Sequence, residues 1–234
     1  FGFDFKPRSF RPESKYLKML LRLGIPMSAQ FAAVLISVLV ISSRINLYGV
    51  AVSAATGVGT KLENIIRIVS NSVGTAAAAM IGQNIAAREF DRVKKILGFA
   101  VVICTAWAAL CAATMLALPE KIFAIFNTDP AVLAYARTYA PAGALCYLGN
   151  GLRASSNSLI NGIGFASLSL ITGLLDGVAA RIGFSLLLAY VIGLGIFGFW
   201  LGSALAGWVP VFIGFAYFFS GKWKTHKLIT QNAE

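Results

Sequence analysis

The sequence predicts an all-α integral membrane protein built as a bundle of six transmembrane helices. Hydrophobic residues make up 58% of the 234 residues and charged residues only 12%, whereas a soluble domain is roughly half apolar and about a quarter charged. Six stretches reach the roughly 20 mostly apolar residues that a helix needs to cross a bilayer. The basic residues between these stretches gather on one side, which fits an even number of crossings.

The first three spans are expected at residues 24–47, 51–81 and 95–118. Tyr48 and Gly49 form the break after the first span, because glycine readily leaves the helical conformation. A charged run from Gly82 to Lys95 follows the second span. The third span has no charge through its middle, so we expect it at the periphery of the bundle.

The last three spans are expected at residues 131–161, 165–192 and 196–220. A loop at 119–130 precedes them, and glycine-rich breaks at 162–164 and 193–195 separate them. Pro141 and Pro210 fall inside these spans, where the missing backbone donor allows a kink.

Two pairs of glycines match the small-residue pattern that lets membrane helices approach closely. The pairs are Gly173 with Gly177 and Gly198 with Gly202. They predict close helix packing at these positions, although a chain with 23 glycines also produces such matches by chance.

The positive charge predicts the orientation of the bundle. A basic leading segment at 1–22, the run at 88–95 and a basic tail at 221–234 would all lie in the cytoplasm, because Lys and Arg near span ends favour that side. The net charge of +11 is therefore explained by topology and not by a nucleic-acid partner. We expect a multi-pass protein of the plasma membrane with both ends of this segment cytoplasmic. The start at Phe1 in place of Met suggests a piece of a longer polypeptide.

Charged and amide side chains occur inside the second predicted span, where contact with lipid makes them costly. Glu63 precedes Arg67 by four residues, a spacing that brings two side chains together on a helix. These two residues form the best candidate for an internal ion pair, and Asn71 continues the same face. The pair either neutralises itself structurally or lines a pathway for substrate or ions.

The fourth and fifth spans also carry polar faces. Asn150, Arg153 and Asn157 on the fourth span fall near one side of the helix. On the fifth span, Arg181 follows Asp176 by five residues, which in an α-helix rotates Arg181 well off the face of Asp176. Each is therefore expected to find partners on other helices.

The first span carries Gln30 but no carboxylate. Taken together, the polar faces favour a substrate or ion pathway, because a transporter needs polar groups where a spanning helix would otherwise have none. The alternative is a set of hydrogen bonds and ion pairs that only joins neighbouring helices.

Nothing in the sequence indicates an enzyme, a cofactor or a metal site. The lone histidine, His226, lies in the polar tail, and no Ser-His-Asp constellation appears within the spans. The three cysteines lie in apolar stretches and match no metal-ligand or redox spacing. We expect only the lipid bilayer and a small-molecule substrate as partners of the spans themselves.

Four stretches carry a resemblance to a known family. Gly57–Leu97 reads GVGTKLENIIRIVSNSVGTAAAAMIGQNIAAREFDRVKKIL, and its helix ends in Gly82, Gln83 and Asn84, followed by small residues and a basic connection. With the stretches 15–30, 159–189 and 195–224, in this order, the chain resembles the multidrug and toxic compound extrusion (MATE) family.

The resemblance implies a transporter of twelve helices in two pseudo-symmetric lobes of six. Such a transporter exports cationic, amphipathic compounds in exchange for sodium ions or protons, by alternating access. This chain would be the carboxy-terminal lobe. Its partner would be the missing amino-terminal lobe or a second copy of the chain, because alternating access needs two lobes.

The chain departs from the family at one functional position. In some members a cation site uses carboxylates on the helices that correspond to the first and fourth spans, and these spans contain none here. We therefore do not expect that cation site in this chain. Ion coupling is expected through the absent lobe, Glu63 or Asp176.

A related flippase of lipid-linked oligosaccharides or polysaccharides is the alternative function. Its substrate is a bulky anion, so its interior should hold more Lys and Arg than carboxylates, and Arg67, Arg153 and Arg181 fit that expectation. The Gly-Gln-Asn junction favours drug export.

Overall fold

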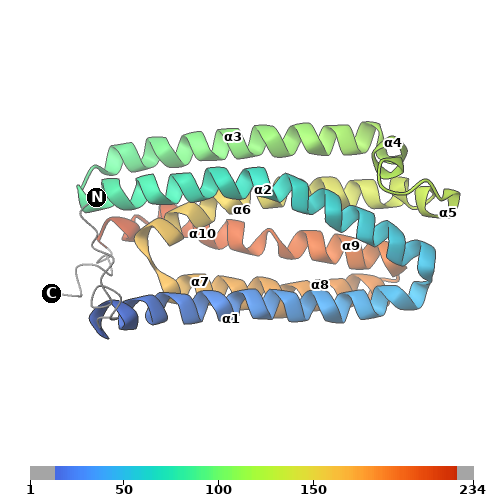
Figure 1. Cartoon of the computed structure of the whole chain (residues 1–234), viewed down its shortest axis with the longest axis horizontal. Coiled ribbons are helices and arrows are strands. Elements are labelled where there is room, and N and C mark those ends of the chain that lie inside the picture. The colour runs from blue at the N-terminus through green and yellow to red at the C-terminus, as the bar shows by residue number, and fades with distance from the viewer. Residues whose placement is uncertain (1–13, 226–234) are drawn as a thin grey trace, which may run out of the picture.

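The predicted spans form long helices that lie side by side, with the connections at the two ends of the bundle (Figure 1). The computed structural model describes residues 14–225. The predicted leading segment and tail therefore lie partly outside the described residues, and the part from Ser14 to Arg22 continues the first helix.

The first half of the chain forms three long helices, α1 (Ser14–Ile45), α2 (Val50–Ala86) and α3 (Phe90–Ala117). A 3₁₀ turn at Asn46–Tyr48 and Gly49, whose φ is 104°, make the expected break after the first span. Positive φ is easily adopted only by glycine, so the turn is placed where the sequence indicates it.

The connection between the second and third helices is shorter than the predicted stretch from Gly82 to Lys95. Only residues 87–89 lie outside helices, and Arg88 makes the turn with a φ of 60°. Charged residues end an apolar span but do not break a helix, because Lys, Arg and Glu have good helix propensity. Most of the run therefore extends α2 and begins α3.

The second half begins with two short helices, α4 (Pro119–Ala124) and α5 (Pro130–Leu133), in the predicted loop. The long α6 (Ala136–Ile163) follows and continues through Pro141. The last two predicted spans contain helices with interruptions. These are α7 (Ala166–Leu174), a π-helical segment at Leu175–Ala180, α8 (Arg181–Leu186), a second π segment at Leu187–Val191, α9 (Gly195–Ala206) and α10 (Val209–Phe219).

The break between α9 and α10 lies at Gly207 and Trp208, directly before Pro210. Proline has no backbone N–H and its ring disfavours a helical residue before it, so an interruption within the sixth span agrees with the expected kink.

Five helical stretches among the described residues are long and apolar enough to cross a membrane: 28–48, 50–86, 90–117, 166–191 and 195–219. Helix α6 corresponds to the fourth predicted span and is long enough, but it does not reach the same apolarity. It packs against α2, α3, α9 and α10, and most of its surface is covered by them. A helix enclosed by other helices needs less apolar surface than one that faces lipid.

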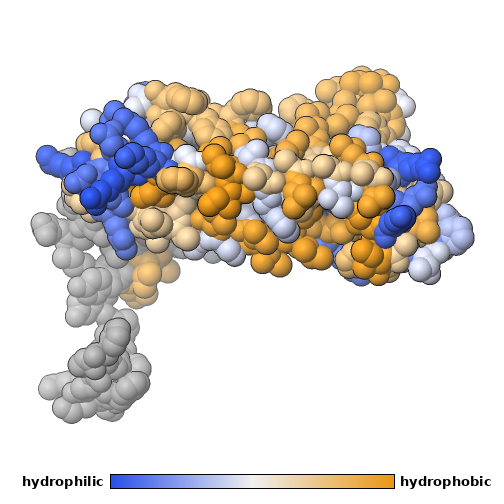
Figure 2. Space-filling view, turned by 90° about the horizontal axis from the view of Figure 1, so that it is seen from above, coloured by the Kyte–Doolittle hydropathy of each residue, from blue (hydrophilic) through white to orange (hydrophobic). Residues whose placement is uncertain are grey.

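Figure 2 shows an apolar surface on the face of the bundle that carries α3: hydrophilic residues gather at both ends and hydrophobic residues cover most of the length between them. The exposed surface of α3 includes Phe99, Val102 and Leu110. Helix α3 packs on α2 and α6 along its length and lies at one edge of the bundle (Figure 1), which confirms its expected peripheral place.

Close backbone contacts hold the helices together. A Cβ atom at Gly177 would lie 3.0 Å from the backbone nitrogen of Val34 on α1, and Gly173 lies against the side chain of Gln30, also on α1. Gly198 and Gly202 lie against the backbone of residues 184–189. Both predicted glycine pairs therefore do lie where another helix approaches closely.

Candidate functional site in the interior of the bundle

The fifth span holds a buried carboxylate between two arginines. Asp176 lies ten residues after the start of the span at Ala166, and its side chain is 0% exposed. Arg153 Nη1 on α6 is 2.6 Å from Asp176 Oδ2, and Arg181 Nη2 on α8 is 3.2 Å from Asp176 Oδ1. Asp176 Oδ2 has no hydrogen bond with suitable angles in the described part of the chain, so its contact with Arg153 is mainly an attraction between charges.

The π-helical segment explains why Arg181 reaches Asp176. In an α-helix a residue five positions on points elsewhere, but the wider π turn brings positions i and i+5 onto nearly the same side. The expectation that Asp176 has a partner on another helix is confirmed by Arg153, whereas the same expectation for Arg181 is wrong because its partner lies on its own helix. Such π segments are frequent at functional sites.

The group Arg153, Asp176 and Arg181, called the triad below, carries one more positive than negative charge. Helices α1, α7, α8, α9 and α10 pack on its π segment. These helices and α6 contain no other acidic residue. The surplus charge is thus not balanced by any of the helices that enclose it.

A second polar contact joins α2 to α6. Glu63 is half-buried and accepts a hydrogen bond of 2.7 Å from the hydroxyl of Tyr139, a residue that is 3% exposed. The predicted ion pair of Glu63 with Arg67 does not form among the described residues, because Arg67 donates to the side-chain oxygen of Asn64 instead. Tyr139 was missed in the sequence because a tyrosine in an apolar stretch has the pattern of a packing residue.

An exposed polar stripe follows α2. Asn64, Arg67 and Asn71 all face outward from this helix, and Lys61 is exposed one turn before them. Charged side chains at this depth avoid lipid, so the stripe is expected to face water or another protein part. Lys61 was not predicted as part of this stripe, because it lies two residues before Glu63 and therefore on a different side of the helix.

The other predicted pathway residues lie on α1 and α6. Gln30 is half-buried on α1 against Gly173, and Asn157 is half-buried on α6. Asn150, also half-buried, donates to the sulfur of Cys146 at 3.5 Å. The triad is thus the one predicted group that the described structure brings into direct mutual contact.

The Gly-Gln-Asn junction forms the last turns of α2. A Cβ atom at Gly82 would lie 2.8 Å from the carbonyl oxygen of Gly162, so this glycine lets the ends of α2 and α6 meet. Asn84 donates to the Met80 carbonyl at 2.8 Å, and Gln83 is exposed. The structure gives the glycine a packing role at this junction.

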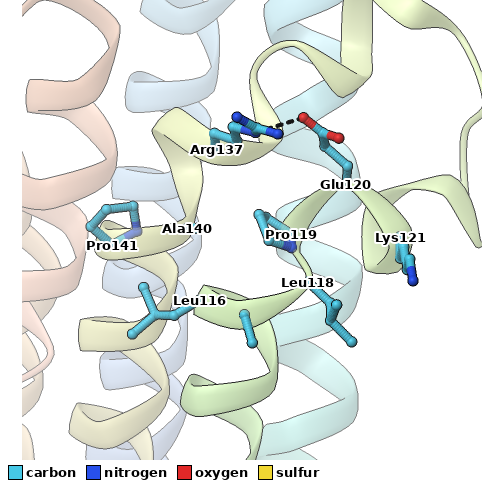
Figure 3. Close-up of a pocket in the computed structure, with 9 residues that line it drawn as sticks. Leu116, Leu118, Pro119, Glu120, Lys121, Arg137, Ala140 and Pro141 are labelled. Carbon is cyan, nitrogen blue, oxygen red and sulfur yellow. Dashed lines mark ion pairs between the residues drawn. The ribbon is translucent and has the colours of Figure 1, made fainter.

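An open pocket of about 470 Å³ lies where α3, α4 and α6 meet (Figure 3). Its rim includes the ion pair of Arg137 Nε with Glu120 Oε1 at 2.7 Å, and Pro119 and Pro141 line its wall. None of the predicted pathway residues lines this pocket. It is therefore separate from the interior site.

The family model described as MatE matches residues 26–176. The chain is 27% identical to "Probable multidrug resistance protein NorM" of Neisseria meningitidis serogroup B, covering 81% of this chain and 41% of that relative. It is 25% identical to "Probable multidrug resistance protein YoeA" of Bacillus subtilis, covering 90% of this chain and 46% of the relative. The chain thus spans less than half the length of these relatives.

Solved structures share the fold. "Crystal structure of MATE in complex with MaL6" superposes with a TM-score of 0.83 at 17% identity, over 95% of this chain and 51% of that chain. "Inward-facing conformation of a multidrug resistance MATE family transporter of the MOP superfamily" gives 0.78 at 17% identity, over 95% and 52%. The bundle corresponds to half of each of these folds.

Proposed function

This chain belongs to the MatE family, and we propose that it is one six-helix lobe of an efflux antiporter that works by alternating access. The antiporter exports cationic or amphipathic compounds across the plasma membrane in exchange for sodium ions or protons. The basic segments at 1–22 and 221–234 lie in the cytoplasm in this arrangement. The names of the curated relatives support drug export, and the polar groups inside the spans support a pathway.

The proposed antiporter needs a second lobe. In transporters built from two repeats, substrate and ion sites lie between the repeats, which rock against each other. The chain covers 51% of one solved MATE chain. The exposed polar stripe on α2 is the surface we assign to the side facing the other lobe, either an amino-terminal lobe or a second copy.

Glu63 is the carboxylate that we assign to ion coupling, and its surroundings are the observation that carries this proposal. Asp176 already contacts two guanidinium groups, so its negative charge is balanced whether or not an ion is present. Glu63 contacts a neutral hydroxyl, with no ion pair among the described residues. A half-buried carboxylate without a resident cation is the one able to take up a proton or sodium ion and release it.

Glu63→Gln should reduce gradient-driven efflux to the rate seen without a gradient, because the amide keeps the contact with Tyr139 but no longer exchanges a cation. The measurement is export of a fluorescent cation by the full-length protein in proteoliposomes under an imposed sodium or proton gradient. Glu120→Gln is the matched control, since Glu120 lies in an exposed ion pair at the end of the bundle. Undiminished efflux by the Glu63 variant at equal protein content would refute the assignment.

The flippase alternative has one specific observation in its favour. Away from the helix ends, the spans contain four basic residues, Lys61, Arg67, Arg153 and Arg181, and only two acidic ones, Glu63 and Asp176. A pathway with surplus positive charge suits a bulky anionic headgroup. Movement of a fluorescent lipid-linked oligosaccharide between leaflets, without export of a fluorescent cation, would favour this function over drug efflux.

A further inference from the structure

The triad has positive charge and hydrogen-bonding capacity that Asp176 does not use. A guanidinium group has five N–H donors in a planar fork, and Asp176 receives one contact from each arginine. Arg181 Nε is buried and has no hydrogen-bond partner in the described structure. The arginines therefore keep several donors available for a further acceptor.

Only the cationic side of the triad can be reached from outside. The side chain of Asp176 is 0% exposed, whereas those of Arg153 and Arg181 are 20% and 16% exposed. An approaching molecule thus meets two guanidinium groups and not the carboxylate between them. A cation is repelled at this place, and an anion is attracted.

No other part of the enclosing helices supplies the missing negative charge. Helices α1 and α6 to α10 contain no acidic residue, and the π segments between α7 and α9 contain only Asp176. The other carboxylate within the spans, Glu63, accepts a hydrogen bond from Tyr139 and forms no ion pair with Arg153 or Arg181 in the described part of the chain. The surplus charge of the triad is therefore available to a ligand.

We propose that Arg153 and Arg181 bind an oxyanion, a carboxylate or a phosphate, carried by an amphipathic molecule. The fork of a guanidinium group matches the two oxygens of such a group, and binding brings the net charge of the triad from one to zero. Resting on the proposed transport function, this inference extends the substrate class from cations to zwitterionic and anionic amphiphiles.

The inference is tested by binding, in the absence of any ion gradient, so that its failure is distinct from a failure of efflux. The full-length protein is placed in micelles of dodecyl maltoside, a detergent without phosphate. Fluorine NMR then follows 4-(trifluoromethyl)benzoate and, for comparison, its cationic counterpart 4-(trifluoromethyl)benzyltrimethylammonium. Phosphatidylglycerol added to the micelles distinguishes a lipid phosphate from a free carboxylate as the bound group, because only a lipid occupant displaces the benzoate.

Arg153→Gln and Arg181→Gln should each weaken benzoate binding about tenfold or more, since each removes one of the two donor groups of an ionic contact. Each variant leaves Asp176 paired with the remaining arginine, so the folded state is retained. Arg137→Gln is the matched control, an arginine of the same helix α6 in an exposed ion pair, and it should leave benzoate binding unchanged. The proposal would be overturned if both triad variants bound the benzoate as tightly as the Arg137→Gln control. It would also be overturned if the cationic probe bound as tightly as the benzoate and lost affinity in the same triad variants.

Discussion

Asp176→Asn should destabilise the protein more than any other single charge substitution in the bundle. Without the carboxylate, two guanidinium groups face each other in a site enclosed by helices, and neither has another acidic partner there. Removing one partner of a buried ion pair typically costs about 3–5 kcal/mol, because the remaining charge is buried without compensation. The measurement is thermal unfolding of the purified protein in detergent, followed by tryptophan fluorescence.

The comparison variants separate buried charge from the loss of a single contact. Arg153→Gln removes one contact but leaves a neutral pair of Asp176 with Arg181, so its effect should be clearly smaller. Asp91→Asn removes an exposed contact with Lys94 and should leave the melting temperature unchanged. If Asp176→Asn melts at the temperature of the native protein, then removing the carboxylate does not leave Arg153 and Arg181 buried without compensation, and the account of the triad is contradicted.

Gly74→Val should also destabilise the bundle strongly, through backbone packing. A Cβ atom at Gly74 would lie 2.8 Å from the carbonyl oxygen of Ala154 on α6, and a backbone oxygen cannot rotate away as a side chain can. Forcing extra atoms into a close-packed contact costs about 1–3 kcal/mol, and membrane helices depend on such small-residue contacts. The melting temperature measures the effect.

Gly57→Val is the control for this packing effect. Gly57 lies on the same helix α2, and a Cβ atom there would meet no atom within 4 Å. Both substitutions change helix propensity equally, so only Gly74→Val should lower the melting temperature through packing. Equal melting temperatures of the two variants would mean that the contact between α2 and α6 is looser than described.

Composition and the breaks between apolar stretches were sufficient to predict the helical bundle. Gly49 is an example, because the absence of a Cβ atom permits a positive φ that few other residues adopt. The boundaries near Gly82 to Lys95 were predicted less well, since charge marks the edge of an apolar span and not the end of a helix. Helix α6 can be more polar than the other spans because other helices enclose it. The hydropathy of one helix taken by itself does not reveal this enclosure.

The candidate site could be predicted only in part, because side-chain partners depend on the packing of distant helices. Charged residues inside apolar stretches correctly drew attention to Asp176, Arg153 and Arg181. The π turn that joins Asp176 to Arg181 was not foreseen, because the sequence pattern was interpreted with α-helical spacing. Tyr139 contacts Glu63 across 76 residues of sequence, and no local pattern predicts such a contact.

The central claim, that this chain is a lobe of a gradient-driven exporter, is tested most directly by flux measurements on the full-length protein. Proteoliposomes containing that protein are loaded with a fluorescent cation, and a sodium or proton gradient is then imposed. We predict export of the dye against the direction of ion movement, and its loss when an ionophore collapses the gradient. Dye movement at the same rate with and without the gradient would contradict the claim.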